Sequence, residues 1–152
     1  MLGTPLVAVH QNTPASGIGN ASDVQMGFDT VDWDPHKLWN SGASTIVLPA
    51  GRYQAQGQCT MPGGTGGLIR AAYMIDFTSG SLAAIGGKVI TGDAKPAYTG
   101  VVGAGYLLNF GRTFKLTAAS TPLAFTVYQD SGGSMTLSSS FGGCAWAINR
   151  LP

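Results

Sequence analysis

The 152-residue sequence contains no glutamate, and charged residues make up only 10% of it, against an average of about 25%. Its eight Lys and Arg are scattered singly, and with seven Asp they give a formal net charge of +1. The sequence therefore lacks the cluster of basic residues that is typical of a nucleic-acid-binding protein. No apolar run reaches the ~18 residues of a membrane span, and the N-terminus lacks the basic and apolar regions of a signal peptide. We therefore expect a protein that binds neither nucleic acid nor membrane and that is made in a cytoplasm.

The sequence also lacks the residues and motifs that most enzymes use for catalysis. Without glutamate, a glycosidase would have to take both carboxylates from seven Asp residues. Neither His10, in an otherwise apolar stretch, nor His36 belongs to a nucleophile elbow, an HExxH motif or a Cys-His arrangement. We expect no catalytic residue, no cofactor and no metal, and we expect His10 to be packed and hydrogen-bonded.

Only two cysteines occur, Cys59 and Cys144, too few for a disulfide framework or a zinc site. Both lie in strand-like sequence, and no secretory signal precedes them. We expect two small buried thiols rather than a disulfide, although the sequence does not show whether the two residues lie close together.

What the sequence does contain is period-2 alternation, most clearly in STIVLPAGRYQAQGQCTM, residues 44–61. Small and apolar residues from Tyr53 to Met61 alternate there with polar ones, as in a strand with one buried face. The polar face carries Gln54, Gln56 and Gln58 where a solvent-facing strand usually carries charges. This face is therefore expected to meet something other than bulk water.

Strand patterns recur along the whole chain, whereas no stretch fits a helix. Short strands separated by Gly- and Pro-rich turns predict a single all-β domain over residues 1–152, a sandwich or a jelly roll. The predicted strands are Leu6–Gln11, Val24–Val31, Thr45–Leu48, Arg52–Met61, Leu68–Phe77, Ser81–Thr91, Gly100–Phe110, Thr113–Ala119, Phe125–Gln129, Ser134–Leu137 and Cys144–Leu151.

Three of these strands are apolar on both faces, namely LVAV, GYLL and CAWAI, beginning at Leu6, Gly105 and Cys144. In a two-layer sandwich only one face of each sheet packs on the core. The second face therefore needs another cover, and we expect it to be another subunit.

The order of motifs resembles a known family. FDTVDWD (residues 28–34), LWN (38–40), LPAGRYQ (48–54), LLNFGRTFKL (107–116), VYQDSGGSMTL (127–137) and WAINRL (146–151) follow one another. Together they resemble the tumour-necrosis-factor and complement-globular-head jelly roll, especially its versions in bacteriophage structural proteins. Pro49, Gly51 and Tyr53 match its Pro-x-Gly-x-Tyr turn, and Phe28-Asp29 match its Phe-Asp entry. Arg112 departs from the acidic residue that often follows the equivalent glycine.

The resemblance implies a ten-stranded, two-sheet antiparallel jelly roll that forms a homotrimer, with the first, last and Arg52–Met61 strands in the inner sheet nearest the three-fold axis. The bulkier residues Val7, Val9, Trp146 and Ile148 are expected to fill the sandwich core. The predicted trimer interface then consists of Leu6, Ala8, Gln54, Gln56, Gln58, Tyr106 or Leu107, Ala145 and Ala147.

The candidate ligand loop is DWDPHKLWN, residues 32–40, which contains Asp32, Trp33, Asp34, His36 and Trp39. Exposed aromatic rings beside polar groups can hold a glycan. An aromatic residue is more often part of the core, however, so we expect both Trp39 and Trp33 to be buried. The two carboxylates, beside a proline, are expected to form turns, and they supply too few oxygens for a calcium loop.

The resemblance therefore predicts a non-enzymatic virion structural protein, assembled in the host cytoplasm. We expect a trimeric capsid decoration protein whose partner is the major capsid protein or another virion protein, because the first strand begins within a few residues of Met1 and leaves no stalk. One alternative is the receptor-binding tip or knob of a tail fibre, and another is a carbohydrate-binding module.

Overall fold

The computed structural model describes residues 4–13, 17–19, 22–62, 69–78, 89–96, 106–130, 132–137 and 143–152, and its strands form two antiparallel sheets. The five-stranded sheet runs in the order β3 (Thr30–Trp33), β1 (Val7–His10), β11 (Cys144–Arg150), β6 (Gly51–Met61) and β9 (Tyr106–Leu116). The second sheet runs in the order β4 (Trp39–Asn40), β5 (Thr45–Leu48), β10 (Thr121–Gln129), β7 (Ile69–Asp76) and β8 (Val89–Pro96), with β2 (Ser22–Gln25) paired to β10.

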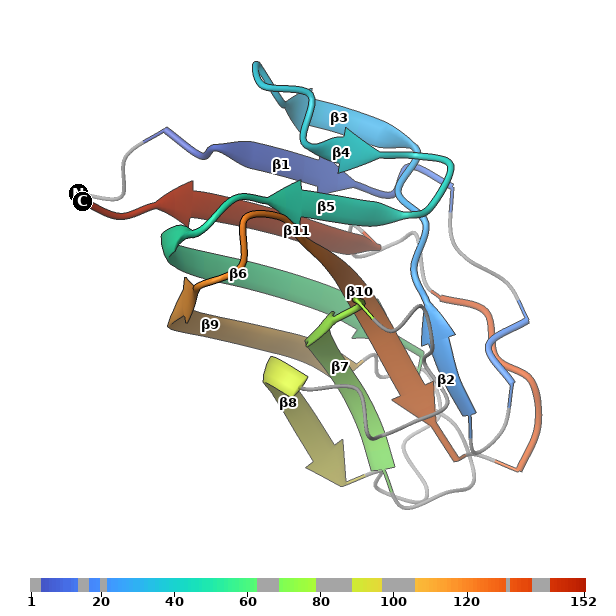
Figure 1. The fold of residues 1–152 in the computed structure, drawn as a ribbon. Coiled ribbons are helices and arrows are strands. Elements are labelled where there is room, and N and C mark those ends of the chain that lie inside the picture. Colours follow the sequence, from blue (N-terminus) through green and yellow to red (C-terminus); the bar gives the residue numbers. More distant parts are fainter. Residues whose placement is uncertain are drawn as a thin grey trace.

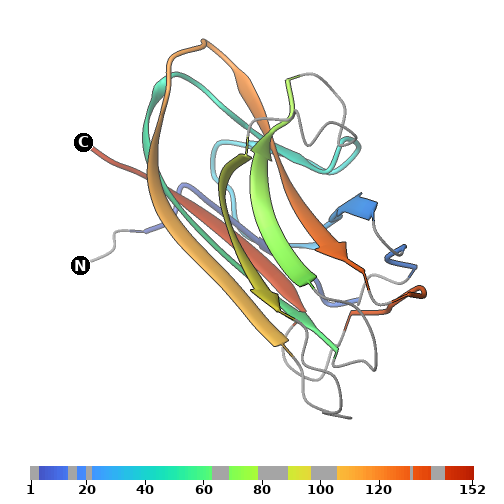
Figure 2. The same ribbon diagram turned by 90° about the horizontal axis from the view of Figure 1, so that it is seen from below.

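The two sheets lie face to face as layers of a sandwich (Figures 1 and 2). Their inner faces meet in an aromatic centre, where the ring of Phe125 lies 5.6 Å from Phe28, 5.5 Å from Phe110 and 6.0 Å from Trp146 between centroids. Burial of such large side chains is the main driving force for folding. No helix among the described residues is long and apolar enough to span a membrane.

Several strand predictions need correction, because alternation along one strand contains no information about its partners. The predicted strand Val24–Val31 is two strands, β2 and β3, which belong to different sheets. The chain crosses between the sheets at residues 26–29, where Met26 and Phe28 are both buried. By contrast, Gly100–Phe110 and Thr113–Ala119 are not separate, since β9 runs through Gly111 and Arg112 as one strand.

Three smaller corrections concern short or turn-like segments. The predicted strand Ser134–Leu137 contributes only a single bridge, from Met135 to Ile18. Gly92-Asp93, expected to form a turn, lies inside β8, and the two-residue strand β4 was not predicted. Residue 68, residues 81–88 and residues 100–105, which belong to three predicted strands, lie outside the described part of the chain.

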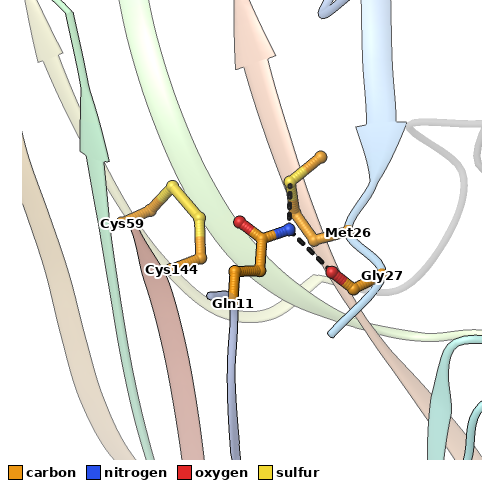
Figure 3. Close-up of a disulfide and its surroundings, with 5 residues drawn as sticks. All are labelled: Gln11, Met26, Gly27, Cys59 and Cys144. Atoms are coloured by element: carbon orange, nitrogen blue, oxygen red, sulfur yellow. Dashed lines mark hydrogen bonds between the residues drawn. A yellow bond between two sulfur atoms is a disulfide. The ribbon is translucent and has the colours of Figure 1, made fainter. Parts of the chain in front are cut away.

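The expectation of two separate thiols is wrong, because Cys59 and Cys144 form a disulfide. The two residues are direct partners in the register of β6 and β11, with their Cα atoms 4.0 Å apart, and both are fully buried. Figure 3 shows the disulfide near Gln11, whose side-chain amide donates to the carbonyl oxygen of Gly27 at 2.6 Å. The sequence could not show this pairing because the residues are 85 positions apart.

Candidate functional site

The five-stranded sheet has one face in the core and one face outside, and the assignment of residues to these faces in β1 and β11 is confirmed. Val7, Val9, Trp146 and Ile148 are at most 1% exposed. Ala8, Ala145 and Ala147, which have the opposite parity, are half-buried. We call the side of the sheet turned away from the core the outer face.

Two rows of side chains cross the outer face, because the strand register places residues of different strands opposite one another. The first row is Trp33, Ala8, Ala147, Gln56 and Gly111. The second row is Thr30, His10, Ala145, Gln58 and Asn109.

The parts of these rows that lie on β1, β11, β6 and β9, apart from His10, line a shallow open depression of about 470 Å³, the central hollow. Alanine and glycine form much of its lining, amides contribute further polar groups, and Asp32 is the one carboxylate among the lining residues that the structure describes. The residues lining it are Ala8, Val9, Asp32, Gln56, Gly57, Gln58, Asn109, Phe110, Gly111, Ala145, Trp146 and Ala147. Small residues let another backbone approach closely, and amides can hydrogen-bond to it without the desolvation cost of charges.

Most of the predicted interface residues lie together on this face. Ala8, Gln56, Gln58, Ala145 and Ala147 all line the central hollow.

The other predicted residues do not line the central hollow. Gln54 is half-buried and Leu107 is 49% exposed. The expected outward position of Leu6 is wrong, because its half-buried side chain packs against the hydrophobic core. Tyr106 is the first residue of β9, and its side chain lies outside the described part. Sequence reasoning missed Asn109 and Gly111, although both share the parity of Leu107 in the LLNFG stretch and could have been assigned from it.

A hydrogen-bonded cluster lies at the β3 side of the outer face. Ala8 pairs with Trp33 and Val9 with Val31, which leaves Asp32 as an extra residue of β3 in a bulge. Bulges redirect side chains, and the carboxylate of Asp32 lies 2.8 Å from Nδ1 of His10. The expectation that Asp32 forms a turn is therefore wrong, whereas that of a hydrogen-bonded His10 is confirmed.

Both ring nitrogens of His10 face oxygen atoms. Nε2 lies 3.1 Å from Oδ1 of Asn12, whose side-chain nitrogen donates to the hydroxyl of Thr30. A neutral imidazole has only one N–H, whereas imidazolium can donate to both oxygens. The hydrogen bond with Asp32, reinforced by Asn12 and by the negative charges nearby, raises the pKa of His10 above its usual value, against a smaller opposing effect of burial.

The neighbouring carboxylate, Asp29, holds the loop after β1. It accepts hydrogen bonds from the backbone N–H groups of Asn12 at 2.7 Å and Thr13 at 2.8 Å. These two bonds stabilise the ionised carboxylate and lower the pKa of Asp29 to about 2. The loop is therefore fixed by an anion at neutral pH.

The candidate ligand loop does not form one binding site. Asp34 accepts the backbone N–H groups of Leu38 and Trp39, each at 2.8 Å, as expected of a turn former. Trp39 is half-buried with its ring 5.7 Å from that of Phe28. His36 is exposed, and Trp33, expected to pack in the core, is instead 47% exposed. The described residues contain no group of three His, Cys, Asp or Glu that could hold a metal.

Comparison with known proteins identifies the fold. No family model and no curated protein sequence matches the chain. The globular domain of zebrafish complement 1qA has a similar structure, with a TM-score of 0.59, 8% identity, and coverage of 98% of each chain. Murine APRIL is also similar, with a TM-score of 0.64, 8% identity, and coverage of 95% of this chain and 97% of APRIL. The two-sheet antiparallel jelly roll of the tumour-necrosis-factor and complement-head type, expected from the sequence, is thus confirmed.

Proposed function

We propose that the chain is the subunit of a non-enzymatic homotrimer whose copies meet through the outer face of the five-stranded sheet. The observation that carries this proposal is the central hollow, which presents alanine, glycine and neutral amides where a solvated sheet face usually carries charges. The fold also supports this proposal, because it is the jelly roll that the sequence resembles, and that resemblance implies a trimer built around this sheet.

The trimer is proposed to act as a virion structural protein that decorates a bacteriophage capsid and bridges major capsid protein subunits. Three weak contacts made together give avidity without any strong single contact. The Cys59–Cys144 disulfide fits this location, because disulfides persist on virion surfaces although assembly takes place in a reducing host cytoplasm. The virion role itself rests on the sequence resemblance.

The trimer is tested by two aspartate substitutions at neighbouring positions of β11. Ala147 lines the central hollow, whereas Ile148 is fully buried in the core. Ala147→Asp should place an unpaired charge in the interface and give a folded monomer. Ile148→Asp should place the charge in the core, at a cost of about 4 kcal/mol or more, and unfold the protein.

Light scattering and circular dichroism separate the outcomes. A wild-type monomer at micromolar concentration would refute the trimer. A trimeric Ala147→Asp protein would show that the outer face is not the interface. Copy number in purified particles then tests the role, since hundreds of copies indicate decoration and a handful indicate the alternative, a tail-fibre tip.

A carbohydrate-binding module is the second candidate, favoured by the exposure of Trp33 beside Asp32 at the margin of the central hollow. A sugar ring could stack on the indole and hydrogen-bond to the carboxylate and amides. Saturable glycan binding by a wild-type monomer, lost in Trp33→Ala, would replace the trimer proposal with this one.

A further inference from the structure

The β3 edge of the five-stranded sheet presents an exposed aromatic side chain with a carboxylate residue on each side of it in sequence. In the described part of the sheet, β3 pairs with β1 on one side and its other side is open. Trp33 is 47% exposed, and its sequence neighbours are Asp32 and Asp34. We call these three residues the Trp33 edge. An exposed indole on an open strand is a strong candidate for a contact residue, because tryptophan is enriched among the residues that dominate interface energies.

β9 forms the opposite edge of the same sheet (Figure 1). A hollow of about 250 Å³ opens there between β9 and the second sheet, with the half-buried apolar side chains of Ile90, Phe114 and Leu116 in its lining. Two exposed cations, Arg112 and Lys115, also line it. We call this depression the β9 hollow.

Among the described residues, the two cations of the β9 hollow have no carboxylate partner. Arg112 donates a 3.3 Å hydrogen bond to the carbonyl oxygen of Ile90. Within the described ranges of the chain neither Arg112 nor Lys115 forms an ion pair. The carboxylate in the lining, Asp76, accepts hydrogen bonds from the backbone N–H and the hydroxyl of Thr78. The described residues of the lining therefore combine apolar side chains with two cations and one carboxylate.

We infer that the Trp33 edge of each subunit docks into the β9 hollow of the next subunit. This inference rests on the proposed homotrimer. Three copies around one axis cannot use an isologous contact, so two different patches must meet at every interface. The two edges of the five-stranded sheet, at β3 and β9, supply such a pair, and their chemistry is complementary.

Each component of the Trp33 edge has a matching group in the β9 hollow. The indole can pack on Phe114 and Leu116 and receive Arg112 or Lys115 against its ring face, a cation–π contact. The exposed carboxylate of Asp32 has one oxygen on His10, so its other oxygen can pair with the same cations. Both oxygens of Asp34 accept backbone N–H groups of its own loop, so Asp34 contributes its negative charge rather than a direct contact. Opposite charges at the two edges also favour one orientation of the neighbouring subunits, because contact between like edges would bring carboxylate to carboxylate or cation to cation.

A charge exchange tests the contact. Trp33→Arg places a third cation against the β9 hollow, and Lys115→Asp removes one of its cations, so each variant should raise the trimer dissociation constant about tenfold or more. The double variant Trp33→Arg/Lys115→Asp restores an opposite-charge pair and should bind at least about tenfold more tightly than Trp33→Arg. Ser134→Asp, which introduces a carboxylate at an exposed position outside both patches, is the control and should leave the constant unchanged.

Sedimentation equilibrium measures the constants, and circular dichroism confirms that each variant is folded. The inference is overturned if both single variants remain as trimeric as the wild type, or if the double variant shows no recovery. Because Ala147→Asp tests the outer face separately, a trimer that responds to Ala147→Asp but not to these variants refutes only this contact. A wild-type monomer refutes the trimer and the contact together.

Discussion

Removal of the Cys59–Cys144 disulfide should cost the protein a large part of its stability. The bond joins two fully buried residues on the neighbouring strands β6 and β11, and it closes a loop of 85 residues in the unfolded chain. Cross-linking restricts the unfolded state, and the loop-entropy relation gives roughly 4–5 kcal/mol for a loop of this length. A domain is usually stable by only about 5–15 kcal/mol, so the reduced protein should be marginal.

Urea unfolding with and without a reductant measures the effect, at one fixed protein concentration because assembly also stabilises the fold. The midpoint should fall sharply in reductant. The Cys59→Ala/Cys144→Ala variant should match the reduced protein and should not respond to reductant. The reasoning is refuted if the two wild-type midpoints coincide, or if both cysteines of the unreduced protein react with a thiol reagent in denaturant.

Two further perturbations test the core and the His10 cluster. Gly57→Ala would place a Cβ atom 2.3 Å from Cζ of Phe110 and should destabilise the fold by about 1–3 kcal/mol in urea unfolding. Gly133→Ala is the control and should be nearly neutral, because its added Cβ atom would meet no other atom within 4 Å. Equal stabilities of the two variants would contradict this packing. The pKa of His10, followed by NMR, should lie above 6.5 and should fall in Asp32→Asn. The His10 contribution to stability is therefore complete below about pH 6.5 and is lost as pH rises through the raised pKa. An unchanged His10 pKa in the variant would contradict this.

Much of the fold could be predicted from the sequence wherever one strand face is buried. Tyr53, Ala55 and Cys59 alternate with exposed or half-buried polar residues in β6 as expected, and all three are fully buried. The same reasoning assigned the bulky residues of β11 to the core, because Trp146 and Ile148 cannot both face outward at an acceptable cost. Local alternation is sufficient for such positions.

Features that depend on strand pairing could not be predicted in this way. The disulfide requires that Cys59 lie opposite Cys144, a matter of register between strands far apart in sequence. The partnership of Asp32 with His10 requires a bulge that alternation within β3 does not reveal. The exposure of Trp33 was not predicted for a different reason, namely that burial of an aromatic residue is only a statistical tendency.

The antiparallel pairing of β1 with β11 has a mechanical consequence. The start of β1 lies beside the end of β11, with Val7 opposite Ile148, so a force that separates these two chain ends loads the inter-strand hydrogen bonds one after another. The hydrogen bonds between β1 and β11 are perpendicular to the strands, so they break one at a time. Breaking them one at a time requires less force than breaking all of them together in shear. Peeling of β11 from β6 would begin at Arg150 and stop at Cys144, where the disulfide holds the strand to Cys59. The bond therefore acts as a mechanical stop that protects the rest of the sandwich under tension.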